Sequence, residues 1–217
     1  MKKYIYILCI AAASMLAACE DMLDKKPYGQ FTADLMTSKD VEGMLAAAYA
    51  GLEAHYFGNN PAFAGPSTNW IFDVRSDDAL KGGGAITMEQ NIHLLEISNL
   101  TSDNVSNFNK WENNFYAIAR THNAMRAIYG STLSEDEKRV FLGELKTLRA
   151  WYYFDLIRIF ERIPYFTESD DPNTVRIDKY TRDEIFAFIK KDCAEAYEML
   201  GDKAPSAGRF NRYVPAA

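Results

Sequence analysis

Residues 134–164 read SEDEKRVFLGELKTLRAWYYFDLIRIFERIP, and this stretch carries the clearest helical pattern in the chain. Ser134 is followed three positions later by Glu137, so the two side chains can each accept a hydrogen bond from a free amide of the first turn. Pro164 lacks an amide hydrogen and disfavours helical geometry in the residue before it. We therefore predict a helix that begins after Ser134 and ends near Glu161.

Apolar residues recur along this helix at steps of three or four positions and form two stripes. A helix that is apolar on two sides must be packed on both, as in the core of a helical domain. The first stripe runs along most of the helix, and the second begins at Ala150. The first consists of Phe141, Leu145, Leu148, Tyr152, Leu156 and Ile159, and the second of Ala150, Tyr153, Ile157 and Phe160.

Three other segments show the helical period. We predict helices from about Ser38 to His55, from about Asn104 to Tyr129, and from a second capping box at Thr181 and Glu184 to a stop at Gly201. Residues 88–97 fit a short helix and an extended segment equally well.

The predicted fold class is all-α, with tetratricopeptide-like antiparallel helix pairs and long loops between the helices. The short connection from Gly130 to Leu133 favours an antiparallel packing of the two helices that it joins. The strict tetratricopeptide consensus is absent, so this pairing rests on the order of the helices and on the length of the connection.

The N-terminus is typical of a bacterial lipoprotein signal peptide. Lys2 and Lys3 precede an apolar run, and Leu16, Ala17 and Ala18 come directly before Cys19. The run of about 15 residues would reach roughly 22 Å as a helix, less than the roughly 30 Å of a bilayer core. We predict cleavage before Cys19 and attachment of lipid, including a fatty acid such as palmitate, to this residue.

These features divide the chain into a signal peptide (1–18), a lipidated cysteine with a tether (19–37) and a helical domain (38–217). Cys193 would be the one cysteine of the mature chain without lipid, so no intramolecular disulfide can form. Its place on an apolar helix face indicates a packed thiol. The formal charge of −6 becomes −8 once the two lysines of the signal peptide are removed, which argues against binding to nucleic acid.

The sequence shows no catalytic or metal-binding pattern. The three histidines are scattered, and His122 fits the buried face of its helix. The glycines at 82–84 are not followed by the lysine of a phosphate-binding loop. Asp155 and Arg158 are three positions apart, and we interpret them as a surface pair worth a few tenths of a kcal/mol. We predict a protein that is not an enzyme and has no cofactor or metal.

Residues 58–84 break the helical period and are rich in Gly, Pro, Asn and Asp. A loop of this length in a compact domain is usually functional or disordered. Aromatic faces and paired polar side chains suit a carbohydrate ligand. Alternatively, Trp70 and Phe72 pack the loop onto the helices while Asp77 and Asp78 cap a turn. The candidate ligand-binding residues are Asn69, Trp70, Asp73, Arg75, Asp77 and Asp78.

Several segments resemble the SusD/RagB family of Bacteroidetes, which are starch-utilisation D-type outer-membrane lipoproteins. Glu161 and Arg162 depart from the Gly-Asp that is usual in this family. The resemblance covers nearly all of this chain but only the N-terminal part of a typical member. The resembling segments are CEDMLDKKP (19–27), WENNFYAIARTHNAMRAI (111–128), FLGELKTLRAWYYFDLIRIFERIPYF (141–166) and YTRDEIFAFIKKDCAEAYEML (180–200).

The resemblance implies a function. A SusD-like protein is anchored by lipid in the cell outer membrane, faces the exterior, binds oligosaccharide and delivers it to a SusC-like TonB-dependent β-barrel transporter. It also implies that the loop around Trp70 lines part of the ligand surface. Family members are more than twice as long, so we expect residues 38–217 to be a truncated N-terminal region. Two alternatives stay open, namely a lipid-anchored helical interaction module and a peptide-binding family member.

Overall fold

The computed structural model divides the chain into one unit of residues 1–32 and a second of residues 33–217. All described residues belong to the second unit. The predictions for Cys19, Asn69 and Trp70 fall on residues that are not among those described. The described residues are 36–52, 73–85, 87–88, 90–99 and 101–217.

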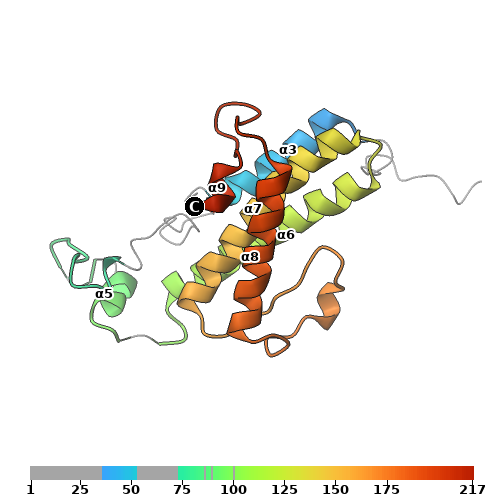
Figure 1. The fold of residues 1–217 in the computed structure, drawn as a ribbon. Coiled ribbons are helices and arrows are strands. Elements are labelled where there is room, and N and C mark those ends of the chain that lie inside the picture. Colours follow the sequence, from blue (N-terminus) through green and yellow to red (C-terminus); the bar gives the residue numbers. More distant parts are fainter. Residues whose placement is uncertain (1–35, 53–72, 86, 89, 100) are drawn as a thin grey trace, which may run out of the picture. The chain divides into compact units, whose positions relative to one another are not determined.

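Helices form the regular structure of these residues, among which no strand occurs. Residues 88–97, which the sequence left undecided, contain a short helix. The long helices lie within a few residues of the predicted bounds (Figure 1). The elements are α3 (Ser38–Tyr49), η2 (Ala50–Leu52), α5 (Gln90–Glu96), α6 (Val105–Gly130), α7 (Glu135–Ile159), η3 (Pro172–Thr174), α8 (Arg182–Met199) and α9 (Tyr213–Ala216).

Both predicted capping boxes are present. The Ser134 amide donates to the Glu137 carboxylate at 3.1 Å, and the Glu137 amide donates to the Ser134 hydroxyl at 3.3 Å. Thr181 and Glu184 make the same reciprocal pair at the start of α8. These contacts satisfy amides that have no partner within the helix, so they fix where each helix begins.

The central helix is α7, which packs against α6, α8 and α3. All residues from Phe141 to Ala150 are buried, so this part of α7 is packed on every side. Figure 1 shows α6 and α7 side by side, joined by the short connection that follows Gly130. The main core cluster is drawn from α3, α6, α7 and α8, together with Ile163 and Tyr165 of the segment between α7 and α8. The fold is thus a layered helical domain built around α7.

A second, small cluster anchors the segment before α5. Val74 is 6% exposed and packs with Ile92 and Leu95, while Ile159 of α7 lies against this cluster. At the start of α6, the side chain of Asn104 donates to the Asn91 carbonyl at 3.1 Å. These contacts attach the described part of the long loop to the helices.

Asp155 is not the surface residue that its spacing to Arg158 predicted. Its side chain is fully buried, and its Oδ2 atom lies 2.9 Å from Nζ of Lys110, which is also fully buried. Asn114 donates to the same oxygen at 2.9 Å, and Arg158 pairs with the other at 3.0 Å. The prediction was wrong because spacing along one helix does not reveal the helix that covers it.

Two glycines of the first helical segment give a matched stability test. A Cβ atom at Gly51 would lie 2.6 Å from the Ala117 Cβ and 2.8 Å from the Tyr152 hydroxyl, whereas a Cβ atom at Gly43 would meet nothing within 4 Å. We expect Gly51→Ala to lower the free energy of unfolding by about 1–3 kcal/mol through overpacking. Gly43→Ala should raise it by up to about 1 kcal/mol, since alanine favours the helix. Chemical denaturation of both variants measures this, and a stable Gly51→Ala variant would contradict the close packing.

Candidate ligand-binding site

The predicted site begins with a tight turn at residues 73–78. The Ser76 hydroxyl donates to the Asp73 carbonyl at 2.7 Å and accepts a hydrogen bond from the Asp78 amide at 3.2 Å. Ser76 therefore makes the side-chain contacts of this turn. Within the described residues, the side chains of Asp77 and Asp78 make no hydrogen bond in this turn, and Trp70 and Phe72 lie outside these residues.

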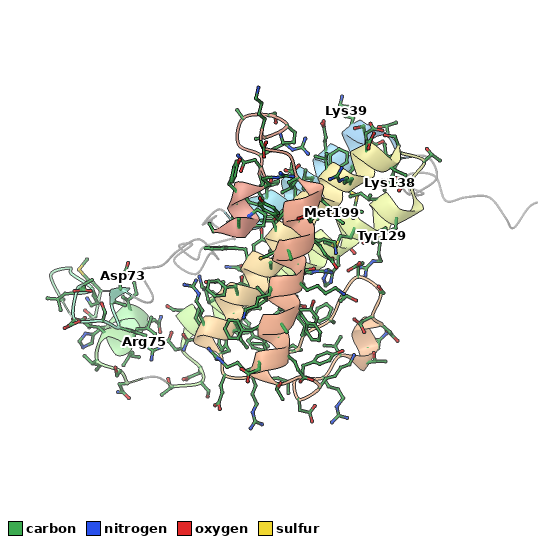
Figure 2. All side chains as sticks on the ribbon, in the orientation of Figure 1. Lys39, Asp73, Arg75, Tyr129, Lys138 and Met199 are labelled. Atoms are coloured by element: carbon green, nitrogen blue, oxygen red, sulfur yellow. The ribbon has the colours of Figure 1, made fainter. Side chains whose placement is uncertain are left out.

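Four of the six candidate residues lie on this turn with their side chains exposed, namely Asp73, Arg75, Asp77 and Asp78. Figure 2 labels Asp73 and Arg75 on the segment before α5. The buried Val74 between them holds the turn in place, so the charged side chains around it project from a fixed base. The turn can offer carboxylates and one guanidinium to the paired hydroxyls of a sugar.

Lys81 orders the segment that follows the turn. Its ammonium group donates to the carbonyl of Gly82 at 3.1 Å and to that of Ala85 at 3.0 Å. Gly82 and Gly83 have φ angles of 71° and 85°, a backbone conformation that glycine adopts without strain. The lysine is thereby occupied by backbone oxygens of its own loop.

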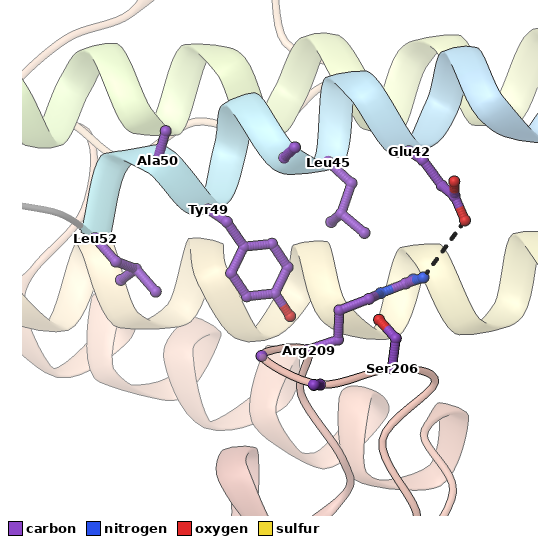
Figure 3. A pocket seen from close by; sticks show the side chains of 10 residues that line it. Glu42, Leu45, Tyr49, Ala50, Leu52, Ser206 and Arg209 are labelled. Atoms are coloured by element: carbon purple, nitrogen blue, oxygen red, sulfur yellow. Dashed lines mark ion pairs between the residues drawn. The ribbon is translucent and has the colours of Figure 1, made fainter.

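A pocket that the sequence did not predict lies between α3 and residues 206–209 (Figure 3). It has a volume of about 550 Å³. Its walls are mostly apolar, and Arg209 reaches across it toward Glu42, with Nη1 3.8 Å from the carboxylate. The lining residues are Glu42, Leu45, Ala46, Tyr49, Ala50, Leu52, Ser206, Ala207, Gly208 and Arg209.

The polar groups at this pocket bind one another. Glu144, which is fully buried, accepts from the Arg209 Nε atom at 3.0 Å and from the Tyr49 hydroxyl at 2.5 Å. The Tyr49 hydroxyl in turn accepts from the Phe210 amide at 2.9 Å. Burial and the bond to Glu144 raise the pKa of Tyr49. The arrangement joins α3, α7 and the C-terminal segment, and we interpret it as a structural tie.

No group of three or more His, Cys, Asp or Glu side chains could hold a metal ion within the described ranges. Cys193 is partly buried on α8, and burial raises the pKa of its thiol, as expected for a packed cysteine. Every described helix is too short or too polar to cross a membrane.

The sequence profile of a SusD-like family, described as "Starch-binding associating with outer membrane", matches residues 21–216. The chain belongs to the SusD-like family. It is 25% identical over 213 residues to SusD-like protein P38 of Formosa agariphila, covering 92% of this chain and 39% of that protein. SusD-like protein P2 of the same organism is 28% identical over 226 residues, covering 100% of this chain and 41% of that protein. This SusD-like chain thus spans about two fifths of the length of these relatives.

Solved structures confirm the predicted fold. A laminarin-binding SusD-like protein superposes with a TM-score of 0.67 at 23% identity, covering 80% of this chain and 37% of that one. Surface glycan-binding protein A of Bacteroides thetaiotaomicron in complex with laminarihexaose gives a TM-score of 0.69 at 18% identity, with coverage of 83% and 37%. The SusD-like chain therefore has the helical architecture of these proteins.

His122 is a core residue of α6, as predicted, but its environment is unusual. Its ring is 1% exposed and lies edge-on to Phe166 at 5.3 Å between centroids. Its Nε2 atom has no hydrogen-bond partner among the residues that the structure describes. Burial first, and then the nearby Arg149, lower the pKa of His122 to about 3, while Glu168 opposes this shift.

Because the pKa of His122 is low, we expect the free energy of unfolding to depend on pH. Its folded pKa of about 3 lies below the ordinary value, so the unfolded chain takes up a proton below pH 6.5 that the folded chain does not. We expect the free energy of unfolding to fall by about 2 kcal/mol between pH 7 and pH 5 because of this group. The charged groups that act on the ring are Arg126, Arg149, Glu168 and Asp170.

Urea denaturation at pH 7, 6 and 5 measures the effect. His122→Gln should remove most of the change in the free energy of unfolding between pH 7 and pH 5. His93→Gln, which replaces the half-buried histidine of α5, should leave this change as it is in the wild type. If the free energy of unfolding of His122→Gln falls with pH as much as that of the wild type, other groups cause the loss of stability.

Proposed function

We propose that this protein is a surface-exposed lipoprotein that binds oligosaccharides and delivers them to a SusC-like TonB-dependent transporter without chemistry of its own. The family match over residues 21–216 is the observation that carries this proposal. The family description names starch binding and association with the outer membrane. Two of the solved structures that share the fold are named for laminarin or laminarihexaose, so a glucan is the first ligand to test.

The ligand site of this proposal combines Asn69 and Trp70 with the exposed charged residues of the turn at 73–78. An aromatic ring covers the C–H face of a sugar, while carboxylate, amide and guanidinium groups pair with its hydroxyls. Support comes from the way in which the turn is held. Val74 is buried against α5, so Asp73 and Arg75 are exposed on an anchored segment rather than packed into the core.

The membrane anchor of the proposal is lipid on Cys19, with the tether at 19–37 leading to the helical domain. Several acyl chains anchor a protein stably, whereas one chain does not. The helices would then form the scaffold and the surface that meets the transporter. Association with the transporter and glycan binding use different parts of the chain, so they can be separated by mutation.

Trp70→Ala is the direct test of the ligand site. We expect it to weaken binding of laminarihexaose or maltohexaose by the full chain at least tenfold, measured by isothermal titration calorimetry, with the melting temperature unchanged. The matched control is Tyr116→Ala, which removes a 59% exposed aromatic ring from α6 and should leave the affinity unchanged. Co-purification with the transporter should persist in Trp70→Ala.

Each other outcome favours a different function. If Trp70→Ala lowers the melting temperature and leaves binding intact, the loop serves packing. If the wild-type chain binds neither glucan but co-purifies with the transporter, it is a helical interaction module. Binding of peptides in place of glycans would identify a peptide-binding family member.

A further inference from the structure

The pocket between α3 and residues 206–209 is bordered by a guanidinium that the fold holds in place. Arg209 donates through Nε and Nη2 to the buried carboxylate of Glu144, and its guanidinium carbon lies 5.2 Å from the centre of the Phe141 ring. Its Nη1 atom makes no hydrogen bond among the described residues and points across the pocket toward Glu42 (Figure 3). A fixed hydrogen-bond donor therefore faces the pocket.

Glu42 supplies an acceptor opposite this donor. Its carboxylate lies 3.8 Å from the Arg209 Nη1 atom, whereas a hydrogen bond between such groups spans about 2.7–3.2 Å. The Glu42 side chain is 57% exposed, and an ion pair that is this long and this open to solvent contributes little to stability. A ligand can therefore enter between the two charges at little cost.

The two charges select the kind of group that fits between them. A guanidinium nitrogen can only donate a hydrogen bond and a carboxylate can only accept one, so a group that binds both must do both, as a hydroxyl does. An anionic ligand would be repelled by Glu42, and a cationic one by Arg209. The ligand that fits is therefore uncharged and carries a hydroxyl.

The walls of the pocket add an apolar surface. Leu45, Ala46, Tyr49 and Leu52 line it on the side of α3 and η2, and its volume of about 550 Å³ lies within the roughly 300–1,000 Å³ of small-ligand sites. A water molecule can meet both charges but gains nothing from apolar walls, whereas a pyranose ring has hydroxyls at its edge and C–H groups on its faces. A sugar therefore matches both parts of the pocket.

We propose that this pocket is a second glycan site, which takes one pyranose ring of an uncharged oligosaccharide. A hydroxyl of the ring accepts from Arg209 and donates to Glu42, while a C–H face lies on the apolar wall of α3. The site uses no residue of the loop at 58–84, so it goes beyond the proposed function and can hold or fail apart from the proposed ligand site.

Nuclear magnetic resonance of the full chain labelled with nitrogen-15 tests the location of the site. Titration with laminarihexaose or maltohexaose should shift the backbone amide signals of Ala46, Ser206 and Arg209, and the same shifts should appear in Trp70→Ala. If the sugar shifts amides of the loop but none of these three, the inference is overturned and the loop site stands. If it shifts no amide in the chain, both proposals fail.

Two neighbouring alanines of α3 give a matched test of the cavity. Ala46 and Ala47 are both exposed, but only Ala46 belongs to the lining of this pocket. We expect Ala46→Phe to fill the cavity and to weaken the affinity read from the Arg209 amide at least tenfold. Ala47→Phe should keep the wild-type affinity, and equal affinities in the two variants would overturn the inference.

The proposed hydrogen bonds are tested by removing one partner at a time. Glu42→Ala should weaken binding at the pocket about tenfold without lowering the melting temperature, so it also decides the case if Ala46→Phe is unstable. Asp136→Ala, which removes an exposed carboxylate of α7, is its control and should have no effect on affinity. Undiminished binding in Glu42→Ala would overturn the inference.

A matched pair of ligands tests the hydroxyl itself. Per-O-methylated maltose keeps the rings and the acceptor oxygens of maltose but cannot donate to Glu42. We expect maltose to shift the amide signals of the pocket and the methylated form to leave them unchanged. Equal shifts from both would show that the pocket takes apolar bulk and does not select a sugar, which overturns the inference and leaves the proposed function intact.

Discussion

The buried pair of Arg149 and Asp192 is the interaction on which the packing of the helices depends most. Two guanidinium nitrogens donate to different carboxylate oxygens at 2.7 Å, and the side chains are only 4% and 6% exposed. A buried charge that loses its partner destabilises a fold strongly, so this pair fixes how α8 lies on α7. Asp155 and Lys110 do the same between α7 and α6. Helix α7 therefore joins its neighbours through charge as well as through apolar packing.

The local features of this fold could be predicted from the sequence, whereas its long-range pairs could not. Capping at Ser134 and the two apolar stripes of α7 depend on residues a few positions apart, so the pattern alone indicates them. Glu144 meets Arg209 across 65 positions of sequence, and no spacing rule connects them. The pocket beside Tyr49 was missed for the same reason. Of the candidate site, the exposed charges of the turn could be predicted, but the anchoring role of Val74 could not.

The described residues separate a scaffold from an exposed acidic segment. The buried carboxylates of the long helices, Glu144, Asp155 and Asp192, are paired with basic side chains. The turn at 73–78 keeps its carboxylates in solvent on a base held by Val74. A scaffold of this kind can hold a variable loop without changing its own packing. Among the described residues, the two meet in the small apolar cluster beside Ile159 and in the Asn104–Asn91 hydrogen bond. Ligand choice would then be set by the loop, and stability by α7 and the helices around it.

A double-mutant cycle on Arg149 and Asp192 tests most directly whether the packing of α8 on α7 depends on this buried ion pair. Arg149→Met and Asp192→Leu should each lower the free energy of unfolding by roughly 3 kcal/mol, since each leaves a buried charge without its main partner. The double variant should lose clearly less than the sum, because neither charge then remains. Single losses below about 1 kcal/mol that add in the double variant would contradict this account, and would mean that α8 is held against α7 without help from the Arg149–Asp192 pair.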